Sequence, residues 1–190
     1  MMRPTFDQAK VILAKHTTEA HLFSHALAVS AAMSAMAEHF GEEPEAWRVL
    51  GYLHDVDYEK YPDEHCSHVA ELLSPEGMDE ADIRAIRAHG YGICSDIEPQ
   101  SNLEKALFTV DELTGIVSAA SLMRPEGITT LNLKSFMKKF KDRRFAAGCD
   151  REIILRGCEM LGMEIQEVAE IVIRGMQAET EALGLGPREA

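Results

Sequence analysis

The sequence has few cysteines and no closely spaced pair of them. Cys66, Cys94, Cys149 and Cys158 are the only four in a chain of 190 residues, and no two form a CxxC motif. Zinc knuckles and thioredoxin-type redox sites are built on such pairs, so neither kind of site is expected. Scattered cysteines are typical of free thiols in a reducing compartment.

Long apolar segments are also missing. The N-terminal stretch has no extended apolar region followed by a small-residue cleavage site, which argues against a secretory signal. No run of about 18 consecutive apolar residues occurs, so a membrane span is not expected. With the scattered cysteines, these absences predict a cytoplasmic protein.

Positive charge is scarce. The chain has 19 lysines and arginines against 32 aspartates and glutamates, which gives a formal net charge of −13. Such a surface repels the phosphates of nucleic acid and anionic lipids, so neither a nucleic-acid duplex nor a membrane is an expected partner. One basic cluster departs from this pattern, and its members are Lys134, Lys138, Lys139, Lys141, Arg143 and Arg144.

Several well-known catalytic motifs are absent as well. The sequence contains no HExxH pair, no glycine-rich phosphate loop of the Walker type and no GxSxG turn. These absences argue against the common metalloprotease, nucleotide-binding and serine-hydrolase designs.

The spacing of apolar residues predicts an all-α fold. They recur at three- and four-residue steps, and no stretch alternates with period two. We expect a single helical-bundle domain of roughly eight or nine helices over residues 1–183, with a metal-site core at about 21–114, C-terminal helices at about 132–183 and a frayed tail at 184–190.

Capping residues predict where many of these helices begin and end. Ser101 with Glu104 is a capping box, and Asp79 is a helix N-cap. Asn132 and Asp150 are expected to cap two later helices. The predicted helices cover about 6–15, 18–41, 44–54, 65–73, 79–89, a segment after 101, segments after 132 and 150, and 164–183.

Five polar residues lie on, or at the end of, helical faces that are otherwise apolar. His25 shares a face with Leu22 and Val29, and His89 follows Ile83 and Ile86 at three-residue steps. The pair His54-Asp55 closes an apolar helix, and Asp111 continues the face of Leu103 and Leu107. Each residue alone has an ordinary explanation, such as a hydrogen-bonded core histidine or a buried salt bridge. A shared metal ion would satisfy all of them at once, because imidazole nitrogen and carboxylate oxygen suit iron, manganese, nickel or zinc.

This ordered set resembles the HD-domain superfamily of metal-dependent phosphohydrolases, in which a histidine, a His-Asp doublet and a distant aspartate lie on helices. The resemblance covers about His21 to Thr114, and it implies that His25, His54, Asp55 and Asp111 surround one metal. His65 and His89 match the two histidines that members with a second metal add, with Asp55 bridging. His65 is favoured over His68 because it precedes an alanine, Ala70, by five positions.

The resemblance implies a hydrolase of phosphoester bonds that uses a metal-bound hydroxide and one or two divalent transition metals. The expected substrate is a nucleotide or other small phosphorylated metabolite. Asp57, Lys60 and Lys105 are candidates for a proton carrier or a phosphate contact, beside Asp55 itself. Lysine is farther from the doublet here than in members with a Gly-x-Lys-like continuation.

The basic cluster is a candidate for holding non-reacting phosphates, and Lys138, Lys139, Lys141, Arg143 and Arg144 are its predicted contacts. The alternative is a solvated helix face that Phe136 and Phe140 anchor to the core. Two other functions stay open: a di-iron oxygenase on the same scaffold, or a metabolite-binding module without catalysis. Substrate, metal identity and oligomeric state are not determined by the sequence.

Overall fold

A computed structural model describes residues 3–187, and the chain is helical through most of that range. The nine α-helices in this range are α1 (Phe6–Leu13), α2 (Ala20–Phe40), α3 (Pro44–Leu53), α4 (Val69–Leu73), α5 (Glu80–Ala88), α6 (Asn102–Leu122), α7 (Leu133–Lys141), α8 (Arg151–Leu161) and α9 (Ile165–Ala178). Over the described residues the only β-type pairing is an isolated bridge between Tyr91 and Ser95. The predicted all-α fold is confirmed.

The predicted capping groups set the starts of several helices. The Ser101 hydroxyl accepts a hydrogen bond from the Glu104 backbone N–H at 3.3 Å, and the Glu104 carboxylate accepts one from the Ser101 N–H at 3.0 Å. The side chains of Asp79, Asn132 and Asp150 likewise accept from backbone N–H groups in the first turns of α5, α7 and α8. These contacts satisfy donors that a helix start leaves free.

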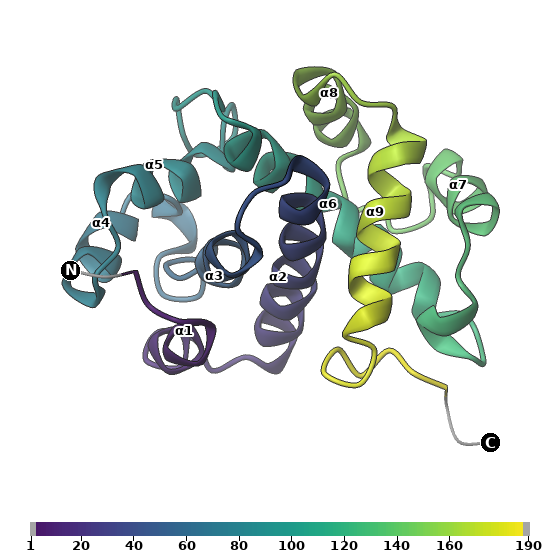
Figure 1. Cartoon of the computed structure of the whole chain (residues 1–190), viewed down its shortest axis with the longest axis horizontal. Helices are drawn as coiled ribbons and strands as arrows, with labels where there is room; N and C mark the ends of the chain where they lie inside the picture. Colours follow the sequence, from purple (N-terminus) through teal and green to yellow (C-terminus); the bar gives the residue numbers. More distant parts are fainter. Residues whose placement is uncertain (1–2, 188–190) are drawn as a thin grey trace.

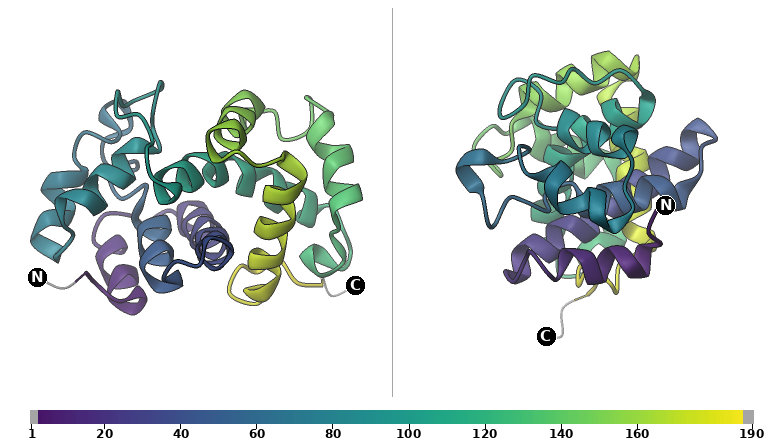
Figure 2. Two further views of the ribbon diagram at one scale, coloured as in Figure 1. Left: turned by 45° about the horizontal axis from the view of Figure 1, so that its top comes forward. Right: turned by 90° about the vertical axis from the view of Figure 1, so that its left-hand side faces the viewer.

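Two apolar clusters form the interior. One joins the inner faces of α1, α3, α4 and α5, and the other is built mainly from α2, α6, α7, α8 and α9. Figure 1 shows the first group of helices on the left and α7, α8 and α9 on the right, with α2 beside α9. The further views in Figure 2 show α6 running from one group to the other. Helices α2 and α6 therefore connect the two halves of the interior.

Helix α2 is long and apolar enough to cross a membrane by length and composition alone. It packs against α3, α6 and α9, and ten of its residues are buried, among them Val29, Met33 and Met36. A core helix of a folded domain passes the same test, and these contacts give α2 that role.

The structure differs from the sequence-based expectation in two segments. The helix predicted over 65–73 begins only at Val69, because Cys66 has a left-handed backbone (φ 68°) that a regular helix does not allow. The last helix ends at Ala178, and part of the predicted frayed tail is packed: Leu185 is buried and its carbonyl accepts from the Ile128 N–H at 2.8 Å. Residues 188–190 of that tail lie outside the described residues.

Candidate metal centre

Residues from five parts of the chain meet in one cluster, and all of them except His54 line the same pocket. His25 projects from α2, His54 and Asp55 directly follow α3, and Asp111 lies in the middle of α6. His65 precedes α4, and His89 follows the last residue of α5. The structure thus brings together all six residues that the sequence predicts as metal ligands.

The first group of side chains is centred on His25, His54 and Asp111. The His25 Nε2 atom lies 2.9 Å from the Asp111 Oδ1 and 3.2 Å from the His54 Nε2. The His54 Nε2 lies 3.4 Å from the same Asp111 oxygen. Donor atoms of His25, His54 and Asp55 all lie within 4.8 Å of one another, a spacing that can hold a metal ion.

A second group is formed by His65 and His89, whose Nε2 atoms are 3.1 Å apart. The Asp55 Oδ1 lies 3.3 Å from the His65 Nε2 and 3.6 Å from the His89 Nε2. Its Oδ2 instead lies 3.3 Å from the His54 Nε2 and 3.7 Å from the His25 Nε2. The two oxygens of one carboxylate therefore face two different groups of histidines.

Outer hydrogen bonds orient three of these rings. The His54 Nδ1–H donates to the Gly51 carbonyl at 2.8 Å, and the His89 Nδ1–H donates to the Ile86 carbonyl. The His65 Nδ1 lies 2.8 Å from the Oδ1 of Asp57, a fully buried carboxylate. A carbonyl oxygen only accepts, so these bonds fix the proton on Nδ1 and turn the Nε2 lone pair toward the pocket. This is the outer arrangement that metal-binding histidines have, and the donor set fits a divalent transition metal.

The histidines and carboxylates of the cluster shift each other's pKa values. Burial opposes charging of His54, but the Asp55 and Asp111 carboxylates outweigh it and hold the pKa of His54 well above its ordinary value. Burial likewise opposes ionisation of Asp111, yet hydrogen bonds from His25 and His54 keep its pKa below the ordinary range. In the metal-free protein, these carboxylates favour a proton on His54. A bound cation would take the place of that proton and release it.

His68, the competing candidate, is turned away from the centre. Its ring stacks on Tyr61 with the centroids 3.8 Å apart, and its two nitrogens lie near the carboxylates of Glu64 (2.8 Å) and Glu71 (3.2 Å). The preference for His65 from the sequence agrees with this placement.

The structure corrects the placement of three further candidates. Asp57 is fully buried, and its carboxylate accepts from His65 and from the His68 N–H (3.1 Å) instead of facing solvent. Lys60 is exposed, with its ammonium 5.2 Å from the centre of the Tyr61 ring. Neither Lys60 nor Lys105 lines the pocket.

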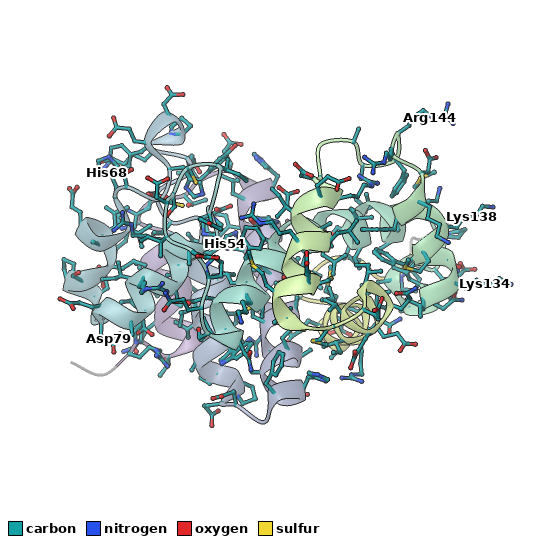
Figure 3. All side chains as sticks on the ribbon, turned by 90° about the horizontal axis from the view of Figure 1, so that it is seen from above. His54, His68, Asp79, Lys134, Lys138 and Arg144 are labelled. Carbon is teal, nitrogen blue, oxygen red and sulfur yellow. The ribbon has the colours of Figure 1, made fainter. Side chains whose placement is uncertain are left out.

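The basic cluster is also placed elsewhere. Figure 3 shows Lys134, Lys138 and Arg144 at the opposite end of the molecule from His68 and Asp79, with His54 between. Phe136 and Phe140 are buried and anchor α7, as the alternative explanation of the cluster requires. Cys149, which follows the cluster in the sequence, lines the pocket. The residues predicted to hold phosphate do not line it: Lys138, Lys139, Lys141, Arg143 and Arg144.

The pocket has a volume of about 350 Å³ and contains residues that sequence reasoning missed. Besides five of the predicted ligands, its lining consists of Tyr58, Gly90, Ile93, Cys94, Glu112, Gly115 and Cys149. Glu112 directly follows Asp111, and the cysteines are far from one another in the sequence, so no spacing singled them out. Within residues 3–187, no lysine or arginine lines the pocket.

Comparison with protein families gives one match: the HD domain, over residues 22–116, half of the chain. The chain belongs to the HD-domain family. The matched segment runs from α2 to the middle of α6 and contains all six clustered ligand candidates. Comparison with curated proteins and with solved structures gives no match.

Membership in the HD-domain family gives the pocket a general chemistry. HD domains bind divalent metals, and the family is usually one of metal-dependent phosphohydrolases. The His and Asp groups of this chain are able to hold a metal. A metal-dependent hydrolase-type domain is therefore the general description that sequence, fold and site share.

Proposed function

We propose that this protein is a metal-dependent hydrolase of phosphoester bonds in a nucleotide or another small phosphorylated metabolite. The observation that carries the proposal is the position of Asp55, whose two oxygens face separate histidine groups. A carboxylate between two metal positions suits a binuclear site, with His25, His54 and Asp111 on one side and His65 and His89 on the other. Two bound metals would supply an activated water and stabilise charge on the phosphoryl oxygens.

The protein side chains divide the remaining work. The outer bonds to Gly51, Ile86 and Asp57 hold three imidazoles in fixed orientations, so the ligands need little rearrangement. Burial of His54 and His89 keeps bulk water away from the inner wall of the pocket. Tyr58 and Ile93 are exposed large side chains at the pocket, placed to contact the non-reacting part of a substrate.

Pocket size and charge support a small substrate. A cavity of about 350 Å³ lies near the lower end of the range for small-molecule sites. Because Asp55, Asp111 and Glu112 line it and no described lysine or arginine does, the negative charge of a phosphoryl group would be balanced by the metals. Such a pocket favours a substrate with one phosphate over one with a long polyphosphate chain.

The first experiment is metal analysis followed by a phosphoester screen. Untagged protein purified without chelator is expected to hold about two equivalents of a transition metal and to release phosphate from part of a panel of small phosphoesters. Asp55→Ala should lose both the metal and the turnover. Asp63→Ala, an exposed carboxylate nearby, is the matched control and should keep both.

Other results would favour the alternatives. Turnover retained by Asp55→Ala would refute the proposal. Oxygen consumption by the iron-loaded protein with no phosphate release across the panel would indicate a di-iron oxygenase. Tight metabolite binding with no product under any metal would indicate a binding module.

A further inference from the structure

A buried thiol lies beside the second group of histidines. Ring nitrogens of His65 and His89 and the sulfur of Cys66 all lie within 4.8 Å of one another, close enough to share one metal ion. Cys66 is only 1% exposed. Its sulfur is therefore a buried neighbour of the two rings, and Cys66 is not among the residues that line the pocket.

The local backbone is shaped to place this sulfur. Cys66 adopts a left-handed conformation (φ 68°), which is uncommon for a residue with a side chain and is found preferentially at functional sites. It is this conformation that delays the start of α4 until Val69 and leaves His65 and Cys66, neighbours in sequence, both facing His89.

Gly90, next to His89, provides the space for the thiol. A Cβ atom at Gly90 would come within 2.8 Å of the Cys66 sulfur and within 2.3 Å of the Cys94 sulfur. Any other residue here would push both sulfurs away. Three neighbouring features therefore favour the same position for the Cys66 sulfur: the backbone of Cys66, the missing side chain of Gly90, and the two rings.

We propose that Cys66 is a thiolate ligand of the metal position formed by His65, His89 and Asp55, and that it makes this position selective for zinc or iron(II) over manganese and magnesium. Thiolate sulfur is a soft ligand and favours the former ions, whereas a site of nitrogen and oxygen alone accepts manganese readily. The proposal rests on the metal-binding part of the proposed function and adds to it the identity of one ligand and the choice of metal.

Cys94 is the competing explanation for the geometry. Its sulfur lies 3.3 Å from that of Cys66, and both thiols are free. If Cys66 serves only to pair with Cys94, no sulfur should be bound to the metal. A substitution of Cys66 is therefore the test, and the same substitution of Cys94 is its matched control. The two sulfurs are neighbours, but only that of Cys66 is grouped with the two histidines.

The test is X-ray absorption spectroscopy of the reduced, zinc-loaded protein, which detects the atoms bound to zinc whether or not the protein is active. Zinc–sulfur bonds are about 2.3 Å long and zinc–nitrogen bonds about 2.0–2.1 Å, so the two shells are resolved. We expect one bound sulfur per chain in the wild type, loss of that sulfur in Cys66→Ser and its retention in Cys94→Ser.

Competition between metals gives a second measurement. Loss of a residue that only supports a metal ligand lowers metal affinity roughly 10- to 100-fold. Cys66→Ser removes a ligand itself, so the ratio of zinc affinity to manganese affinity should fall by at least this much. Cys94→Ser should leave the ratio unchanged. Circular dichroism checks that both variants are folded, and the wild-type spectrum tests the ligand without any variant.

The outcomes that overturn the proposal are distinct. Stoichiometric zinc with nitrogen and oxygen neighbours alone removes Cys66 from the site and leaves the phosphoester hydrolase intact. Loss of the sulfur signal in Cys94→Ser but not in Cys66→Ser would show that Cys94, and not Cys66, binds the metal. A Cys66–Cys94 disulfide that persists in the metal-loaded, reduced protein refutes the ligand role, and a protein that binds no metal refutes both proposals.

Discussion

Replacing Asp57 with asparagine would test how the protein orients His65. The Asp57 carboxylate is fully buried, lies 2.8 Å from the His65 Nδ1 and accepts from the His68 N–H at 3.1 Å. An amide of the same size keeps the shape but loses the charge. A hydrogen bond to a charged group contributes about 1.5–3 kcal/mol.

That energy predicts the size of the effect. At about 1.4 kcal/mol for each factor of ten, it corresponds to roughly a 10- to 100-fold loss of affinity, the range typical of lost outer-shell partners. The loss should fall on the metal position that contains His65 and spare the one that contains His25. Asp57→Asn should therefore bind its first metal as the wild type does and its second more weakly.

Isothermal titration calorimetry of the metal-free protein resolves the two binding steps. Asp63→Asn, an exposed carboxylate in the same segment, is the control and should give the wild-type titration. An equal loss at both positions, or none at either, would refute the positioning role of Asp57. A lower thermal stability with both affinities unchanged would show that Asp57 is structural only.

Three further predictions follow from other contacts. Gly90→Ala should lower the free energy of unfolding by about 1–3 kcal/mol in urea denaturation, because the added methyl group overlaps the Cys94 sulfur. The raised pKa of His54, held up by carboxylates against the effect of burial, stabilises the metal-free protein fully below about pH 6.5 and less as pH rises through the folded pKa. Urea denaturation of chelator-treated protein should therefore show stability that falls above about pH 6.5, and calorimetry should show metal affinity that rises over the same range. Stability that rises with pH, or metal affinity that falls, would contradict this. Arg151→Met should cost at least about 3 kcal/mol in the same denaturation assay, because the buried guanidinium donates to five backbone carbonyls between Phe140 and Cys149; a loss below about 1 kcal/mol would show that these bonds are replaceable.

The ligands that sequence reasoning located share a physical reason for being predictable. His25 lies among inward-facing apolar residues of α2, and His89 extends the buried stripe of Ile83 and Ile86. On a regular helix, spacing fixes direction, so these side chains had to point into the interior. Asp111 follows the same rule on α6, between the buried residues Leu107 and Thr114.

The sequence-based predictions differ from the structure where the position of a segment depends on tertiary packing. The charge pattern of α7 shows which face is basic but not where that helix lies, and it lies away from the pocket. The sequence predicts a helix over 65–73, whereas the structure has a left-handed residue at Cys66 and the helix begins at Val69. Cys66 and Cys94 are 28 residues apart, so their proximity leaves no local pattern in the sequence.

The distribution of the ligands over five parts of the chain has a consequence for how much folded protein a cell holds. His25 and Asp111 are 86 residues apart in sequence, so the unfolded chain has no comparable site. A metal that binds only the folded form at a free concentration 100 times its dissociation constant adds about 2.7 kcal/mol of stability. Because the site joins the two halves of the interior, a cell short of that metal would hold more of the chain in protease-sensitive form. Metal supply would then set the abundance of this protein as well as its activity.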